Sequence, residues 1–174
     1  MAAIVREITS KTWFQNDLVS REYPWLGPQD LQSDAFKGVR TSKNELSIYL
    51  IEGEGHKAAE AVDRVLAALA ATRDHVPQLD YVVISRDAVQ ALALELTKTL
   101  GNTPDPEVNS WHLDLVKLNS TRLVAFCQAL QKSGTFSRKS IKQVAKLLDT
   151  GLATGHLDAS LVNPKLKESI ARYL

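Results

Sequence analysis

The stretch DPEVNSWHLDLVKLNSTRLVAFCQALQK, residues 105–132, decides the fold that this sequence predicts. Asp105 can cap a helix, Pro106 fixes the φ angle of the first helical position, and Glu107 adds an acid to the first turn. The centre of the stretch, LVAFCQAL, is apolar on nearly every side, as in a helix that others pack around. We therefore interpret the stretch as one long helix from Pro106 to about Lys132.

Two more helices are predicted after this one. Ser137 caps a basic helix that ends at Gly151. Asn163 and Pro164 then begin the last helix, because an amide side chain and a proline are typical of a helix start. Together with the long helix, these elements predict a helical bundle in the C-terminal part of the chain.

The residues before this stretch predict a small sheet. Residues 45–52 alternate apolar and polar side chains, and with residues 34–39 they predict a hairpin with a longer turn. Residues 79–85 are short, apolar and β-branched, which is typical of a strand covered on both faces. On either side of this strand, residues 57–75 and 86–100 carry apolar side chains at helical spacing.

This order of elements predicts an α+β protein. Its small mixed β-sheet consists of the N-terminal hairpin and one central strand, packed against the C-terminal helical bundle. A length of 174 residues favours a single domain with one core. We divide it into a strand- and loop-rich part at 1–55, a helix–strand–helix part at 56–104 and a helical, basic part at 105–174.

The composition is that of an ordinary globular chain, with 44% hydrophobic and 24% charged residues. No apolar run is long enough for a signal peptide or a membrane span, so we expect a cytoplasmic protein of bacterial type that does not enter a membrane. The single Cys127 fits a reducing compartment. The sequence contains no recognisable nucleotide, thiol or metal motif, and we assign it no cofactor, no metal and no catalytic residue.

Positive charge gathers in the second half of the chain. Residues 117–174 carry ten positive and three negative side chains, a net of +7, which leaves −6 for residues 1–116 because the whole chain is +1. On the predicted helix 137–149, the positive side chains form one stripe. The candidate nucleic-acid or anion-binding residues are Lys132, Arg138, Lys139, Lys142 and Lys146. The alternatives for this stripe are an ordinary solvated helix face and a surface for an acidic protein partner.

Aromatic residues gather in a loop-rich segment near the N-terminus. Trp13, Phe14, Tyr23 and Trp25 lie close to two prolines, and aromatic side chains on irregular backbone are typical anchors at protein interfaces. We therefore predict that these four residues bind a partner. The alternative is that they pack over the open end of the sheet.

Asn109 and His112 share a face of the predicted long helix and are candidates for a polar pocket. His112 and Asp114 are two residues apart, so on a helix they would point in different directions and would not act as a pair. His56 and Glu60 have a spacing compatible with a metal, but their place at a helix start favours an ordinary helix terminus. His75 is interpreted as a helix-end cap.

The leading hypothesis from these observations is a non-enzymatic interaction protein, an accessory subunit or regulator that binds a protein partner. One alternative is a nucleic-acid-binding module that uses the basic helix 137–149. The other is a small enzyme with a pocket near His112. Self-association into a homo-oligomer is left open.

Overall fold

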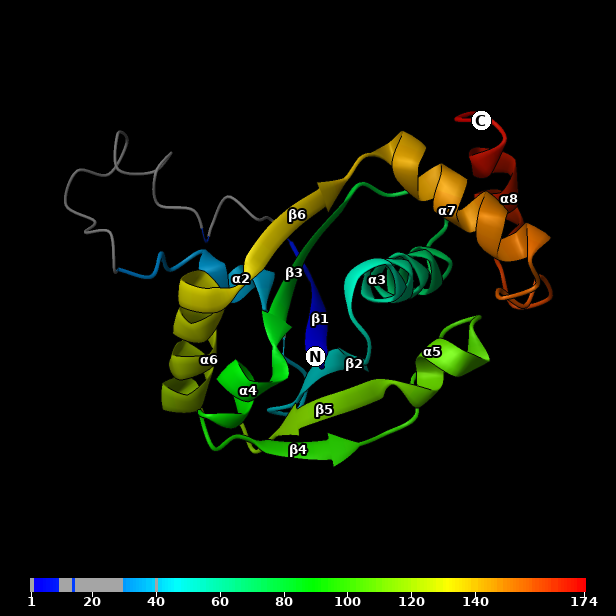
Figure 1. The fold of residues 1–174 in the computed structure, drawn as a ribbon. Coiled ribbons are helices and arrows are strands. Elements are labelled where there is room, and N and C mark those ends of the chain that lie inside the picture. The colour runs from blue at the N-terminus through cyan, green and yellow to red at the C-terminus, as the bar shows by residue number, and fades with distance from the viewer. Residues whose placement is uncertain (1, 10–13, 15–29, 40) are drawn as a thin grey trace.

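The computed structural model describes residues 2–9, 14, 30–39 and 41–174 (Figure 1). Its centre is a six-stranded sheet in the order β4-β5-β2-β1-β3-β6, and every neighbouring pair is antiparallel. The strands are β1 (Ala3–Ile8), β2 (Leu46–Ile51), β3 (Leu79–Ser85), β4 (Glu95–Lys98), β5 (His112–Val116) and β6 (Thr135–Lys139).

Helices cover both faces of this sheet. They are α2 (Ala35–Gly38), α3 (Gly55–Ala70), α4 (Arg86–Gln90), α5 (Pro106–Ser110), α6 (Ser120–Ser133), α7 (Ile141–Ala153) and α8 (Pro164–Ile170). Figure 1 shows a strongly curved sheet, with β6 and β3 on one arm and β5 and β4 on the other. Helices α3 and α7 lie on the concave side, whereas α6 and α4 lie on the convex side.

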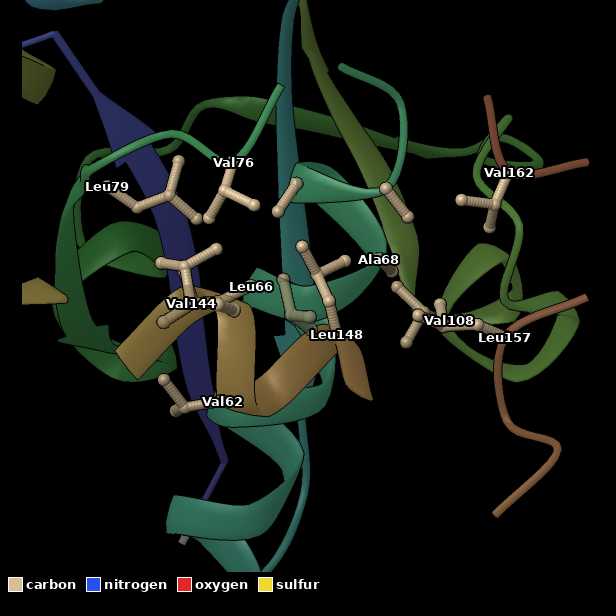
Figure 2. Close-up of a cluster of buried hydrophobic side chains, with 14 of the residues drawn as sticks. Val62, Leu66, Ala68, Val76, Leu79, Val108, Val144, Leu148, Leu157 and Val162 are labelled. Atoms are coloured by element: carbon tan, nitrogen blue, oxygen red, sulfur yellow. The ribbon is translucent and has the colours of Figure 1, made fainter. Parts of the chain in front are cut away.

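Each face of the sheet has its own apolar core. On the concave side, Leu66 of α3 and Leu148 of α7 are fully buried and belong to one cluster with Leu79 of β3 (Figure 2). On the convex side, Phe126 and Leu130 of α6 belong to a second cluster. Alternate side chains of a strand point to opposite faces, so the central strands supply apolar residues to both cores.

The predicted small mixed sheet is wrong, because the sheet has six strands and is antiparallel throughout. The predicted hairpin is also wrong. Residues 35–38 form the short helix α2, and β2 pairs instead with β1 and β5. Short apolar segments separated by a polar turn look alike whether they pair with each other or with distant strands, so local pattern did not reveal the partners.

The predicted long helix is wrong as well. Helix α5 begins as predicted, with the Asp105 carboxylate accepting hydrogen bonds from the N–H groups of Glu107 and Val108, but it ends at Ser110. The chain then forms β5, which pairs with both β2 and β4. Lys117 follows with a φ of 55°, in the left-handed region that breaks regular structure, before α6 begins.

Two other predicted helices are shorter than expected. Ser85 caps α4 as predicted, but after Gln90 the chain turns and forms the edge strand β4. The predicted basic helix is wrong in its first turn: Arg138 and Lys139 belong to β6, and Ser140, not Ser137, caps α7. The helices therefore do not form one C-terminal bundle against a small sheet.

Three elements are confirmed. The predicted helix 57–75 corresponds to α3, which runs from Gly55 to Ala70. The predicted strand 79–85 is β3. The last helix, α8, begins at Pro164 with Asn163 as its cap, because the Asn163 side chain accepts a hydrogen bond from the Lys165 N–H group.

The sheet forks between β1 and β2. Their pairing covers three positions, from Ala3 opposite Ile51 to Val5 opposite Tyr49. Beyond that point β1 stays paired with β3 as far as Ile8, and β2 stays paired with β5. The two arms of the sheet therefore separate at Arg6, and we call the opening between them the fork.

Candidate functional site

A cavity of about 840 Å³ lies at the fork. Its floor comes from the separating strands and includes Arg6 and Glu7 of β1 and Ser47 and Tyr49 of β2. One wall is the segment after α3, with Thr72 and Arg73, and another is the loop 100–103. This size is within the range of small-molecule sites. We call this cavity the fork pocket.

Three arginines and two carboxylates line the fork pocket. Arg73 donates to Glu7 over 2.6 Å from Nη2 to Oε1. Arg138 of β6 donates from Nε and Nη2 to the two Asp80 oxygens over 2.5 and 2.7 Å. With Arg6 as the third cation, the lining carries one more positive than negative charge.

The guanidinium groups of Arg73 and Arg138 keep donors for another molecule. A guanidinium has five N–H groups. Glu7 takes one from Arg73 and Asp80 takes two from Arg138, and within the part of the chain that the structure describes neither arginine has another hydrogen-bond partner. Both side chains are partly exposed, so an incoming anion can reach them.

Arg6 bridges the two arms of the fork. Its Nη1 donates to the Ser47 carbonyl over 2.7 Å, at a position that the β1–β2 pairing does not include. Burial lowers the pKa of Arg6, against the attraction of Glu7, Tyr49 and Asp114. Burial also raises the pKa of Tyr49 to about 12, so its hydroxyl keeps its proton at neutral pH and can donate.

A hydrogen-bonded network lies behind one wall of the pocket. The Thr99 hydroxyl donates to Asp114 Oδ2 over 2.7 Å and lies 2.8 Å from His112 Nδ1. The Ser47 hydroxyl donates to the other Asp114 oxygen over 3.0 Å. The His112 ring also meets the edge of Tyr49, with ring centroids 5.2 Å apart. These contacts fix the orientation of the buried His112 ring.

This network assigns the tautomer of a neutral His112. A carboxylate only accepts hydrogen bonds, so the single Thr99 hydroxyl hydrogen points to Asp114. The Thr99 oxygen then accepts from His112, which places the ring hydrogen on Nδ1. Nε2 is 3.8 Å from Asp114 Oδ1, beyond hydrogen-bond distance, and keeps its lone pair. His112 therefore acts as an acceptor through Nε2.

The loop 100–103 is held in place by Asn109. The Asn109 side-chain oxygen accepts hydrogen bonds from the N–H and hydroxyl groups of Thr103, and the side-chain NH₂ donates to the Thr103 carbonyl. The backbone carbonyl of Asn109 accepts from the Gly101 N–H. Gly101 packs so closely that an added Cβ would lie 2.8 Å from Asn109 Oδ1 and 3.3 Å from His112 Cβ. This wall of the fork pocket is therefore fixed.

Asn109 and His112, the candidate pocket residues, lie on different elements. Asn109 is in α5 and fixes the loop, whereas His112 is the first residue of β5 and lines the cavity. Their predicted placement on one helix is wrong. The predicted separation of His112 and Asp114 is also wrong, because residues two apart on a strand share a face. The sequence signal that could have corrected both predictions was the alternation of polar and apolar residues in HLDLV.

The five candidate anion-binding residues do not form one helical stripe. Arg138 pairs with Asp80, and Lys139 pairs with Asp63 over 2.6 Å. Lys142 and Lys146 are exposed on α7, and Lys132 is exposed near the end of α6. Only Arg138 of this set lines the fork pocket.

Sequence reasoning did not single out Arg6, Arg73, Thr99 or Asp80 as site residues. They come from four separate segments, and no local pattern links them.

Of the four aromatic candidates, only Phe14 is within the described residues. It is buried and stacks on Phe136 of β6, with ring centroids 5.0 Å apart. It therefore packs over the sheet, which was the alternative interpretation for this segment. Trp13, Tyr23 and Trp25 lie outside the residues that the structure describes, so their predicted role as partner anchors stays a prediction.

A second cavity, of about 560 Å³, lies between α3, α5 and α7, and we call it the α3 cleft. Arg64 donates from Nε and Nη2 to the buried Asp105 over 2.6 and 2.9 Å, and from Nη1 to Glu107 over 2.5 Å. Its guanidinium also lies over the Trp111 ring, 5.7 Å from the centroid. These contacts tie α3 to the start of α5.

No protein-family model, curated protein sequence or solved structure matches this chain. Among the described residues, no helix is long and apolar enough to cross a membrane. The same residues contain no group of three or more His, Cys, Asp or Glu side chains placed to hold a metal ion. The chemistry of the fork pocket is therefore interpreted from its own geometry.

Proposed function

We propose that this protein binds a small anionic molecule in the fork pocket. The observation that carries the proposal is the excess of cations in the lining, where three arginines face two carboxylates. Charge-assisted hydrogen bonds from arginine to carboxylate or phosphate are stronger than neutral ones. The low dielectric of a partly enclosed pocket increases their strength further.

The donors in the pocket support this proposal. Arg73 and Arg138 each keep N–H groups that their carboxylate partners do not use. Tyr49 also lines the pocket, and its phenol is protonated at neutral pH, which makes it a neutral hydrogen-bond donor. An anion held by these groups would not need a metal ion or a helix terminus.

This function corresponds most closely to the hypothesis of a pocket near His112. Binding is the part that the geometry supports, and a chemical reaction there stays a separate hypothesis. The hypotheses of a protein partner and of a nucleic-acid-binding surface also stay predictions. Phe14 is buried and therefore no longer supports the hypothesis of a protein partner as an exposed anchor. The continuous basic helix on which the nucleic-acid hypothesis was based is not present, because Arg138 and Lys139 belong to β6.

Isothermal titration calorimetry with inorganic phosphate and pyrophosphate tests the proposal. We expect saturable binding with a millimolar or tighter dissociation constant, because Arg73 contributes charge-assisted hydrogen bonds. Arg73→Gln should weaken binding about tenfold or more, the loss that about 1.4 kcal/mol produces. Lys146→Gln makes the same charge change on the exposed face of α7 and should leave binding unchanged.

Two outcomes would contradict the proposal. One is the absence of any saturable heat for both anions at low ionic strength. The other is an equal loss of binding in Arg73→Gln and Lys146→Gln, because that result would mean that the anions respond to overall charge and not to the pocket.

A further inference from the structure

The fork pocket is larger than a simple anion needs. Its volume of about 840 Å³ is several times that of one phosphate ion and suits a molecule of metabolite size. Arg73, which keeps N–H groups that Glu7 does not use, accounts for the charged group of such a ligand. The rest of the ligand would contact the other lining residues, which include His112, Tyr49 and Thr103.

His112 is a fixed acceptor in this lining. Its Nδ1 is committed to Thr99, which is in turn committed to Asp114. A neutral His112 therefore keeps the lone pair of Nε2, and a ligand with an O–H or N–H group can donate to it. Asp114 accepts from both Thr99 and Ser47, so these two hydroxyls already have an acceptor within the protein.

A site of this kind selects ligands by their hydroxyl groups. When a partly buried acceptor loses its donor, the desolvation of that acceptor is not recovered. A site built to hydrogen-bond a ligand hydroxyl therefore rejects an analogue of the same shape that lacks it far more strongly than an apolar site rejects an extra group. His112 is buried and is held by the Thr99 hydroxyl and by the edge of the Tyr49 ring, so its ring orientation is fixed.

We propose that the ligand of the fork pocket is a hydroxylated anion, such as a sugar phosphate or a polyol phosphate, whose hydroxyl donates to His112 Nε2 while its anionic group meets Arg73. This inference rests on the proposed function and specifies the class of its ligand. The anionic group supplies most of the affinity, and the hydroxyl supplies the selectivity.

Two probes that differ in their hydroxyl groups test the inference. Glycerol 3-phosphate and n-propyl phosphate carry the same charged group on a three-carbon chain, and only the first has free hydroxyls. We expect glycerol 3-phosphate to bind the wild-type protein about tenfold or more tightly. Equal affinity of the two probes would overturn the inference and leave the proposed anion binding intact. If neither probe nor inorganic phosphate binds, the proposed function itself fails.

Variants separate the two contributions. His112→Phe should remove the preference for glycerol 3-phosphate and leave the affinity for n-propyl phosphate within about twofold, because a phenyl ring keeps the contact with Tyr49 but has no acceptor. Arg73→Gln should weaken both probes equally. A preference that survives in His112→Phe would overturn the assignment of the hydroxyl to Nε2.

A second measurement begins with the wild-type protein. Long-range ¹H–¹⁵N NMR spectra of the wild-type protein with a neutral His112 ring should show the ring hydrogen on Nδ1. The Thr99→Val protein should lose this single tautomer, because valine cannot accept from Nδ1. A wild-type hydrogen on Nε2 would overturn the inference, since Nε2 would then be a donor.

Discussion

The fork pocket and the α3 cleft both contain arginines and carboxylates, but they use them in opposite ways. In the α3 cleft, Arg64 donates from all three of its nitrogens to Asp105 and Glu107 and lies over Trp111. In the fork pocket, Arg73 and Arg138 meet one carboxylate each and keep further donors. An arginine whose nitrogens are all engaged connects structural elements, whereas one with remaining donors can recognise a ligand.

Burial accounts for this difference. The Asp105 side chain is 0% exposed and that of Arg64 is 20% exposed, whereas Arg73 is 45% and Glu7 is 25% exposed. A buried charge is stable only when it is paired, so Arg64 engages all three of its nitrogens with the two carboxylates of the α3 cleft. The Arg73–Glu7 pair of the fork pocket is partly hydrated and can change its partner, whereas the Asp80 partner of Arg138 is buried.

The largest expected effect is on the α3 cleft. Asp105→Ala leaves Arg64 without its buried partner and also removes the cap of α5, so the free energy of unfolding should fall by about 3 kcal/mol or more. Glu107→Ala, at the exposed partner of the same arginine, should lower it by less than about 1 kcal/mol. Urea denaturation of both variants measures the difference, and equal losses would mean that the two carboxylates contribute alike.

A smaller effect is expected at the wall of the fork pocket. Gly101→Ala places a methyl group against Asn109 and His112, and such overpacking should cost about 2 kcal/mol. The same variant should also weaken phosphate binding, because the loop 100–103 must shift. Asn102→Ala, at an exposed neighbour in that loop, serves as the control and should change stability by less than about 0.5 kcal/mol. An unchanged thermal unfolding midpoint in Gly101→Ala would show that the loop is not held tightly.

The raised pKa of Tyr49 predicts a loss of stability in alkali. The folded protein keeps the phenol proton up to about pH 12, whereas the unfolded chain releases it near pH 10.0. This contribution is therefore complete below pH 10.0 and is lost as the pH rises toward about 12. Between about pH 9 and pH 11, the wild type should lose about 1 kcal/mol more stability than Tyr49→Phe.

Urea denaturation at these two pH values measures that difference. Cys127, whose pKa burial raises to about 12, is present in both proteins and contributes equally to each. Parallel losses of stability in the wild type and in Tyr49→Phe would contradict the assignment of the alkaline loss to Tyr49.

The smallest expected effect on stability is at the arginine that matters most for binding. Arg73→Gln breaks a partly exposed ion pair with Glu7, so unfolding should change by less than about 1 kcal/mol. The affinity of Arg73→Gln for phosphate should nevertheless fall about tenfold, because the variant lacks the charged donors of Arg73. A large loss of stability with little change in binding would reverse the comparison and make Arg73 a structural residue like Arg64.

Local signals in the sequence predicted elements that local interactions determine. The apolar spacing in 57–75 identified α3, and the β-branched run at 79–85 identified β3. The caps at Ser85, Asp105 and Asn163 were also found, because a cap depends on a side chain and backbone groups two or three residues away. The alternation in HLDLV was present but was outweighed by the helix start before it and the apolar run after it.

The sequence by itself determined where several helices begin, which residues are apolar enough for a core, and that His112 and Asn109 are polar residues close to one another in the chain. Tertiary structure alone decided the six-stranded order and the fork, because strand partners are chosen by burial on both faces and not by neighbours in sequence. It also decided the site, since Arg6, Arg73, His112 and Arg138 come from separate segments that only the curved sheet and the turn after α3 bring to one cavity. The charge of each side chain follows from its chemistry, but its role depends on how completely the fold buries and pairs it.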